Sequence, residues 1–521
     1  MTQDMHTLNR RAFIRQSACA ALGATAMVNT LSYLHLTNAA LAQSSPTSDY
    51  KALVCLFLAG GNDSNNLLIP GGTPANNPVR AHYVNGRGML AINDLSQTLT
   101  VPSTTGIFGQ YYPGVNSPLS VHPNAGQIAE LFNSGDLAFV CNVGSLAEPI
   151  PNRQAFLNKL VDLPSDLYSH SDQQMQWQTS LADSNAQSGW GGRIADMLHE
   201  AYNAEQSKVS MSISLAGINT WQRGTLAETL PYTIGTNGAE ALIGYGPKNA
   251  PYRDAYHTGA SFTEPNYKNN RQGTRLRTLE TLLRLTRSNL LEDTYVNVAS
   301  NARTAEETIG AATSAAQATG INFNQHFQSA NSQLGRKLKM VAQLIAGRSA
   351  LGNSRQIFFV SVDGYDIHRE HLSAHAALMN ELSNGMMAFR NTLKAMGDWD
   401  KVLTFTASDF NRTFTPNGTS AQDGTDHAWG GHAMVMGGPV VGGELYGHFP
   451  SLKVGNGAGS LDADKSRGRF IPSVSVDQYS AILARWFGVG PSEMEEIFPN
   501  LHRFDDPFTS STANMQFIPT A

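Results

Sequence analysis

The sequence has few cysteines, no cluster of basic residues and, beyond its first 42 residues, no long apolar run. Only three of its 521 residues are Cys, and none has the spacing of a thiolate metal site. A membrane-spanning helix needs about 18 apolar residues in a row, and no such run occurs. Charged residues make up 15% of the chain and the formal net charge is −5. These features exclude wholesale disorder and argue against nucleic-acid binding, and the length suits one large domain or two.

The first 42 residues have the pattern of an export signal. Arg10 and Arg11 form a twin-arginine motif in "LNRRAFIRQ", and a mildly apolar stretch follows that ends in "ALA" at residue 42. Polar residues such as Asn29 and His35 interrupt this stretch, which argues against a membrane anchor. Without the signal, 33 basic and 40 acidic residues remain. We expect the twin-arginine translocation machinery to export a mildly acidic protein, with no integral membrane segment, to the periplasm or beyond.

Two cysteines remain after the signal. Cys55 and Cys141 each lie within an apolar run that is typical of a buried strand. Since burial is the usual state of a free cysteine, we expect two buried thiols. A disulfide is the alternative, because the periplasm is oxidising.

Short apolar runs alternate with helical patterns along the chain. These runs cover residues 52–60, 137–144, 209–217, 356–364, 401–410 and 432–438. They are continuously apolar rather than alternating, which indicates strands that are covered on both faces. The sequence therefore predicts an α/β fold with a mainly parallel central sheet.

The region between the third and fourth runs differs in composition. A polar segment rich in Gly and Asn (about 218–275) precedes two helical stretches. In the second stretch, five apolar residues share one helical face: Leu334, Leu338, Val341, Leu344 and Ile345. We interpret about 218–320 as an insertion into a single domain of residues 43–521, followed by a helix that covers the sheet.

Carboxylates and imidazoles follow the predicted strands. Asp63 follows the first run, and Asp409 and Arg412 follow the fifth. After the fourth run come Asp363, Asp366, His368, His371 and His375, and the segment "TDHAWGGH" before the sixth run contains Asp426, His427 and His432. Ligands bind at the carboxyl ends of the strands in open parallel sheets. His and carboxylate side chains suit zinc or a similar divalent ion, so this pattern predicts a metal site.

Two groups of such ligands would hold two ions. A pair of ions can stabilise the attacking and leaving oxygens of an in-line displacement at phosphorus or sulfur. Arg412 would then orient an anionic oxygen of the substrate.

Five segments together resemble a known family. They are "LVCLFLAGGNDSNNLLIP", "LGRKLKMVAQLIAG", "FFVSVDGYDIH", "TFTASDFNRT" and "GTDHAWGGHAMVMGGPVVGG". In this order, behind a twin-arginine signal, they resemble the bacterial domain-of-unknown-function family numbered 1501. That resemblance covers nearly the whole mature chain. It implies the three-layer α/β/α sandwich of alkaline-phosphatase-like proteins, a group that includes sulfatases.

The resemblance also implies a set of site residues. Two divalent ions are expected, zinc or alternatively calcium, manganese or magnesium. By position, one ion would be held by Asp63, Asp426 and His427, and the other by Asp366, either His368 or His371, and His432. Related enzymes usually place this histidine four residues after the Asp, whereas here the two candidates come two and five residues after Asp366.

The catalytic nucleophile is the least defined part of this pattern. Related enzymes present a Ser, Thr or modified Cys at a helix N-terminus, and Ser169 in "YSHSDQQMQWQ" fits such a start. The alternative is that Ser169 or Ser171 only caps the helix. Ser64, beside Asp63, is a rival nucleophile.

Three hypotheses follow for the function. The first is an exported metal-dependent hydrolase that acts on small phosphate or sulfate esters. The second is a binding or accessory protein that keeps the scaffold without turnover. The third is a purely structural surface protein.

Overall fold

The computed structural model of this chain describes most of the predicted mature protein. The described residues are 49–101, 103–184, 186–203, 207–226, 229–239, 267–283 and 305–519. The predicted signal and much of the predicted insertion lie outside them. Residues Tyr50–Ala521 form one compact unit.

A nine-stranded mixed sheet lies at the centre of this unit. Its strands are β1 (Lys51–Leu58), β5 (Leu137–Gly144), β6 (Ser212–Ser214), β7 (Tyr232–Thr233), β8 (Arg355–Val362), β9 (Val402–Ser408), β10 (Gly431–Met436), β11 (Leu445–Gly447) and β12 (Val474–Ser475). Their order is β11-β5-β10-β9-β1-β8-β6-β7, and β12 also pairs with β5. Each of the six predicted runs overlaps one of these strands.

The direction of one strand decides where the polar loops meet. β1 pairs in parallel with β8 and β9, whereas β10 is antiparallel to both of its neighbours, β9 and β5. The start of β10 therefore lies at the same edge as the carboxyl ends of β1, β8 and β9. This arrangement confirms the mainly parallel sheet and places the loop before β10 beside the loops that follow the other three strands.

Helices and a small second sheet accompany the central sheet among the described residues. The helices are α2 (Pro78–Arg87), α3 (Thr105–Phe108), α4 (Gly126–Asn133), α5 (Arg153–Leu157), α6 (His170–Thr179), α7 (Trp190–Tyr202), α8 (Arg271–Leu283), α10 (Phe323–His326), α11 (Gln333–Ala346), α12 (Arg348–Leu351), α13 (His371–Met396), α14 (Val476–Phe487) and α15 (Met494–Ile497). The described residues also include short 3-10 turns at η1 (Gly88–Leu90), η4 (Trp399–Lys401) and η5 (Leu501–Arg503). The second sheet is antiparallel and consists of β2 (Leu68–Pro70), β4 (Leu119–Val121) and β3 (Thr98–Leu99).

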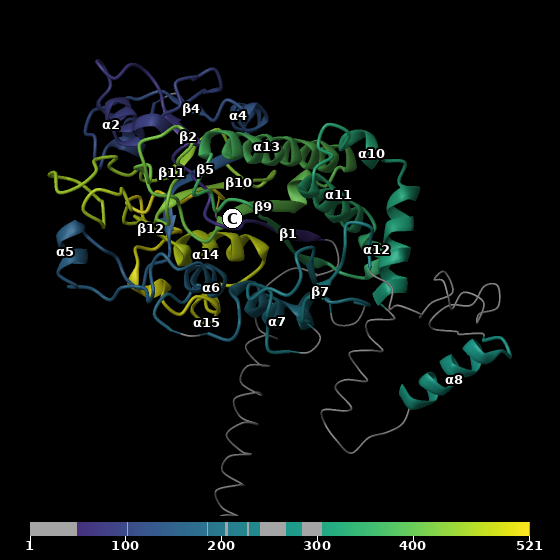
Figure 1. Cartoon of the computed structure of the whole chain (residues 1–521). Coiled ribbons are helices and arrows are strands. Elements are labelled where there is room, and N and C mark those ends of the chain that lie inside the picture. The colour runs from purple at the N-terminus through teal and green to yellow at the C-terminus, as the bar shows by residue number, and fades with distance from the viewer. Residues whose placement is uncertain are drawn as a thin grey trace, which may run out of the picture. The chain divides into compact units, whose positions relative to one another are not determined.

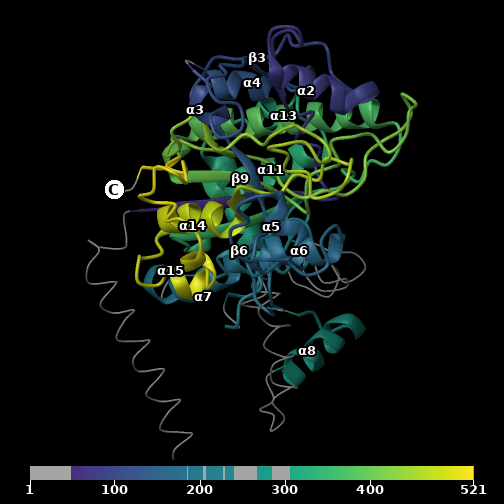
Figure 2. The same ribbon diagram turned by 90° about the vertical axis from the view of Figure 1, so that its left-hand side faces the viewer.

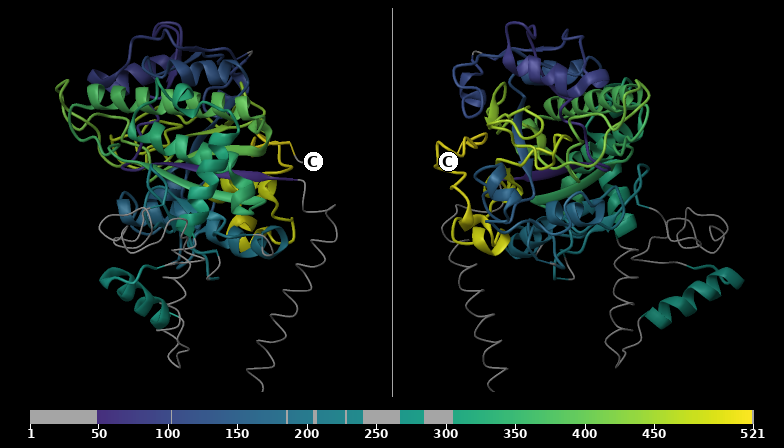
Figure 3. Two further views of the ribbon diagram at one scale, coloured as in Figure 1. Left: turned by 90° about the vertical axis from the view of Figure 1, so that its right-hand side faces the viewer. Right: turned by 60° about the vertical axis from the view of Figure 1, so that its left-hand side comes forward.

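Helices cover both faces of the central sheet, as predicted (Figure 1). Side chains along β1 alternate between two separate cores: Val54 and Leu56 pack on the side of α11 and α13, and Leu53 and Phe57 on the side of α7 and α14. Figure 2 shows the sheet between these helical layers, and both views in Figure 3 keep the green α13 and the yellow C-terminal helices on opposite sides. The unit is therefore a three-layer α/β/α sandwich.

Other predictions about the core and the cysteines are also confirmed. The five apolar residues predicted to share a face of α11 are all buried. Cys55 and Cys141 are both buried and free.

In the part of the chain that the structure describes, no helix has the length and hydropathy to cross a membrane.

Asp477 gives the fold a pH-dependent stability. It is the second residue of α14 and only 2% exposed, and its Oδ1 has no hydrogen-bond partner among the described residues. Burial raises the pKa of Asp477 to about 7, despite the nearby charge of Arg193. From pH 4 to pH 7 the unfolded chain therefore ionises this carboxyl while the folded chain keeps it protonated, which lowers the free energy of unfolding.

We expect Asp477→Asn to be more stable than the wild type above pH 7 by roughly 2–4 kcal/mol. The difference should shrink as the pH falls below 7 and disappear near pH 4. Urea unfolding between pH 4 and pH 8 measures it. Asp94→Asn, in an exposed loop, is the control and should not reproduce this gain, and a constant difference at all pH values would contradict the prediction.

Candidate metal centre

The loop after β1 packs closely against the loop after β8. Gly60 and Gly61 have φ angles of +113° and +87°, which L side chains rarely adopt. A Cβ atom on Gly60 would lie 2.4 Å from the backbone N of Asp366, and one on Gly61 would lie 2.5 Å from the ring of Phe410. The two glycines thus allow the close backbone approach that fixes Asp366 at the edge of the sheet.

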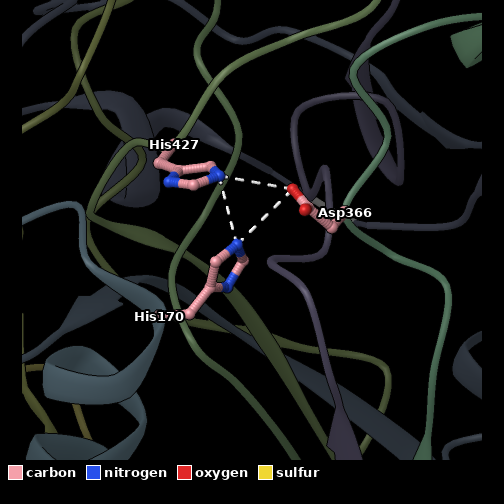
Figure 4. Close-up of side chains that lie close together, drawn as sticks. All are labelled: His170, Asp366 and His427. Carbon is pink, nitrogen blue, oxygen red and sulfur yellow. Dashed lines mark hydrogen bonds and ion pairs between the residues drawn. The ribbon is translucent and has the colours of Figure 1, made fainter.

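Three side chains from different segments converge at this edge (Figure 4). His170 is the first residue of α6, Asp366 lies in the loop after β8, and His427 precedes β10. The Nε2 atoms of His170 and His427 are 3.1 Å apart. Asp366 Oδ1 lies 3.5 Å from the former and 3.3 Å from the latter. The three ligand atoms all lie within 4.8 Å of one another, close enough to share one metal ion.

Each imidazole is oriented through its other ring nitrogen. His170 Nδ1 lies 2.6 Å from Oδ2 of the fully buried Asp409. His427 Nδ1 donates to the carbonyl oxygen of Tyr168 at 2.8 Å. With the Nδ1 positions committed to these acceptors, both Nε2 atoms present lone pairs toward Asp366. This is how proteins usually orient histidines that bind metal.

The cluster fits a divalent cation. Burial lowers the pKa of His427 and the nearby charge of Arg412 adds to this effect; together they outweigh the hydrogen bond to Tyr168, so the Nε2 of His427 is unprotonated at neutral pH. A single proton can form a hydrogen bond within only one of the three pairs made by the two Nε2 atoms and Asp366 Oδ1. A metal ion at the centre can bind all three atoms at once. Ligand atoms 2.0–2.1 Å from a tetrahedral ion are about 3.3 Å apart, close to the observed separations.

His368 adds a third imidazole to the cluster. Its Nε2 lies 2.9 Å from Asp366 Oδ1 and 3.2 Å from His427 Nε2. Its Nδ1 lies 3.1 Å from Asp426 Oδ1, so this imidazole is oriented by a carboxylate in the same way as His170. His368 is 43% exposed and forms the solvent side of the cluster.

Asp426 was predicted as a metal ligand, and the structure gives both of its oxygens to other partners. Oδ1 contacts His368 and accepts a hydrogen bond from Asn417 at 3.3 Å, and Oδ2 accepts from Arg467 at 2.7 Å. Within the Asp-His pair of "TDHAWGGH", only His427 points its ligand atom into the cluster. Asp426 orients His368 instead.

Arg412, predicted to orient an anionic oxygen of the substrate, lies beside the cluster, where its guanidinium is engaged by protein groups. Its fully buried guanidinium donates from Nη1 to Asp366 Oδ1 at 2.6 Å and from Nε to Thr425 Oγ1 at 3.2 Å. Burial raises the pKa of Asp366, but the hydrogen bond and charge of Arg412 outweigh it, so the pKa lies below its usual value. Asp366 is therefore a carboxylate at neutral pH.

Asp63 and His371, both predicted as ligands, lie in a separate buried cluster. Arg87 Nη2 forms an ion pair with Asp63 Oδ2, and both side chains are fully buried. His371 Nε2 is 2.6 Å from the same oxygen, outside the geometry of a hydrogen bond. Burial raises the pKa of Asp63, but the charge of Arg87 holds it well below its usual range. The positive charge beside Asp63 is therefore the guanidinium of Arg87, whereas the sequence predicted a metal ion there.

His432, predicted for the second ion, is a buried residue of β10. Its Nδ1 accepts a hydrogen bond from the backbone N–H of Asn142 at 3.3 Å, and its ring stacks on Phe449 at 5.0 Å. Burial lowers its pKa to about 3. It also lines a cavity of about 30 Å³, which is large enough for one water molecule.

Ser169, the predicted nucleophile, precedes α6 but directs its hydroxyl elsewhere. Its Oγ donates to Asp172 Oδ2 and lies 3.1 Å from Ser171 Oγ. The neighbouring His170 reaches the cluster instead. Sequence reasoning did not select His170, because it follows no strand. The signal that was available is its position at a helix start, next to the serine.

Fold and site together define a class: a three-layer α/β/α protein with a histidine–carboxylate cluster at the strand ends. The profile of the family described as "Protein of unknown function (DUF1501)" matches residues 50–459. The chain belongs to this family. No curated protein sequence matches it.

Solved structures with some similarity were also found. Two crystal structures of Ps i-CgsB, one in complex with k-i-k-neocarrahexaose, each have 10% identity and a TM-score of 0.29, over 88% of this chain and 78% of theirs. The PsFucS1 sulfatase from Pseudoalteromonas sp. has 11% identity and a TM-score of 0.30, over 89% of this chain and 72% of its own.

Proposed function

We propose that the protein is an exported hydrolase that uses a divalent metal ion to cleave small phosphate or sulfate esters. The observation that carries the proposal is the convergence of Nε2 atoms from His170 and His427 on Asp366 Oδ1, with each Nδ1 engaged elsewhere. His368 completes the set as a fourth ligand at the solvent side. The twin-arginine motif at residues 10–11 supports export.

The charges around the cluster favour an anionic ligand once a cation is bound. Three carboxylates (Asp366, Asp409 and Asp426) and three guanidinium groups (Arg412, Arg467 and Arg469) contact the cluster, its histidines or Asp426, which gives a formal charge of 0 with neutral imidazoles. A divalent ion changes this charge to +2. An anionic ester is then attracted to the exposed side of the site.

The chain's own residues have distinct roles in this proposal. A bound divalent ion supplies Lewis acidity, which polarises the ester oxygen and favours ionisation of water. Arg412 neutralises the charge of Asp366 and holds this carboxylate in position through a hydrogen bond. Arg467, 39% exposed beside Asp426, is placed to bind an anionic oxygen of the substrate. No Ser or Thr hydroxyl contacts the cluster among the described residues, so we expect water to be the nucleophile.

Metal-dependent turnover tests the proposal. The mature chain, purified with its metal, should hold close to one ion per chain and hydrolyse an aryl phosphate or an aryl sulfate, and a chelator should abolish turnover. Asp366→Asn should reduce turnover at least about 100-fold, because it removes a ligand. Asp363→Asn, an exposed position in the same loop, is the matched control and should keep it. Full turnover by Asp366→Asn or by the chelated protein would refute the proposal.

A binding protein without turnover is the second candidate. The observation that favours it is the engagement of the Ser169 hydroxyl, the predicted nucleophile, with Asp172. In this case the metal-loaded chain should bind inorganic phosphate or sulfate but release no alcohol from either ester. Calorimetry with these anions, run beside the turnover assay, separates the two candidates.

A further inference from the structure

His427 is held at two points by residues from two other segments of the chain. Its ring Nδ1 donates to the carbonyl oxygen of Tyr168 at 2.8 Å. Its own carbonyl oxygen accepts a hydrogen bond from Arg469 Nε at 2.8 Å. These two contacts fix both the rotation of the imidazole and the path of the backbone that carries it.

The two holding residues also contact each other. The guanidinium carbon of Arg469 lies 4.0 Å from the centre of the Tyr168 ring, a cation–π distance. The backbone N–H of Arg469 donates to Asp462 Oδ1 at 3.0 Å, and its Nη1 lies 3.4 Å from Asp464 Oδ2. Tyr168, Arg469 and His427 therefore form a closed loop of contacts, which we call the His427 clamp.

The backbone of Tyr168 is in an unusual conformation. Its φ angle is +73°, in the left-handed region that is rare and costly for an aromatic residue. This conformation directs the carbonyl oxygen of Tyr168 at His427, two residues before His170 enters the cluster. The turn that contains Tyr168 and His170 thus supplies one ligand, His170, and orients another, His427. Arg469 stacks on the ring of the strained residue, which stabilises the turn in this state.

We propose that the Tyr168–Arg469 pair is a positioning device that sets the metal affinity of the site. It holds His427 in the Nδ1–H tautomer with Nε2 directed at Asp366. The inference rests on the proposed metal site. Neither residue contacts the ion, so both act through His427. Outer partners of metal-binding histidines are typically worth 10–100-fold in metal affinity, and we expect a loss of this size when the clamp is opened.

Substitutions that open the clamp without touching a ligand test the proposal. Arg469→Gln removes the stacked cation, whereas Arg469→Lys keeps a cation over the ring and one donor, and should restore most of the affinity. Tyr168→Ala removes the stacking surface, whereas Tyr168→Phe keeps it and should behave as the wild type. The matched control is Arg348→Gln, because Arg348 stacks on Tyr50 at 4.5 Å and pairs with Asp398 far along the sheet from the cluster.

The readouts are the Zn²⁺ dissociation constant, from competition with a chelator, and the visible absorption spectrum of the Co²⁺-loaded chain. We expect Arg469→Gln and Tyr168→Ala to weaken Zn²⁺ binding about 10–100-fold and to change the Co²⁺ spectrum. Arg348→Gln should lower thermal stability only. Tyr168→Ala and Arg469→Gln are independent, so a folding failure of one leaves the other as the test.

Two results would overturn the inference in distinguishable ways. If the wild-type chain binds neither ion, the proposed metal site fails and the clamp fails with it. If the wild type binds Zn²⁺ and both opening variants bind it equally well with an unchanged Co²⁺ spectrum, the site stands and the clamp is only a structural contact.

Discussion

Replacing His427 with alanine should lower the affinity of the mature chain for Zn²⁺ by at least about 100-fold and abolish metal-dependent turnover. The reason is geometric, because His427 Nε2 lies 3.1–3.3 Å from the ligand atoms of His170, His368 and Asp366. Loss of one outer partner already costs 10–100-fold, and His427 is a direct member of the set. Competition with a chelator measures the affinity.

The matched control for this prediction is His326→Ala, at the end of α10 and partly buried like His427. It should leave both the affinity and the turnover unchanged. The unfolding transition of each metal-free variant should stay close to that of the wild type, since His427 is partly exposed. Unchanged Zn²⁺ binding by His427→Ala would remove the basis of the proposed site.

Replacing Arg87 with methionine should destabilise the folded chain by about 3–5 kcal/mol. Arg87 and Asp63 are both fully buried, and Arg87 also donates to the backbone carbonyl oxygens of Thr413 and Phe414 at 3.2 and 3.1 Å. Methionine fills much of the volume but leaves the Asp63 carboxylate without its counter-charge. Denaturant unfolding of the metal-free chain measures the loss.

Arg503→Met is the control, because Arg503 pairs with Asp183 at 2.7 Å near the surface and should contribute about 1 kcal/mol or less. The same experiment separates two roles for Asp63. As a partner of Arg87, Asp63→Asn should change stability and leave the metal content unchanged. If Asp63 is instead the metal ligand that the sequence predicted, Asp63→Asn would lower the number of bound ions per chain.

The fold was predictable because its strands are buried on both faces. That environment requires continuous apolar runs such as "LVCLFL" in β1, and such runs can be recognised without any knowledge of tertiary contacts. The strands β7, β11 and β12 of the central sheet were not predicted, since they are too short to carry a pattern.

The neighbourhood of the site was also predictable, but the pairing of its residues was not. The carboxyl ends of parallel strands share one edge, which led to Asp366, His368, His427 and Arg412, and the structure brings these together. Asp426 and His427 are adjacent in sequence, and only the path of the loop decides which of them faces the cluster. His170 enters from the start of α6, a position that strand patterns do not reveal.

The buried pair of Asp63 and Arg87 explains why Asp63 lies outside the cluster, although the sequence predicted it as a metal ligand. Asp63 follows a strand as a ligand would, but Arg87 comes from α2, and only tertiary packing brings its guanidinium to the carboxylate. His371 is then held between Asp63 and Thr425. A carboxylate at a strand end therefore does not identify its partner, which can be a metal ion or an arginine.

A crystal structure of the mature chain grown with Zn²⁺, with anomalous data collected at the zinc edge, tests the central claim most directly. We predict one strong peak bounded by His170, Asp366 and His427, within about 2.0–2.2 Å of their ligand atoms. Absence of a peak there, or a peak between Asp63 and His371 instead, would contradict this account.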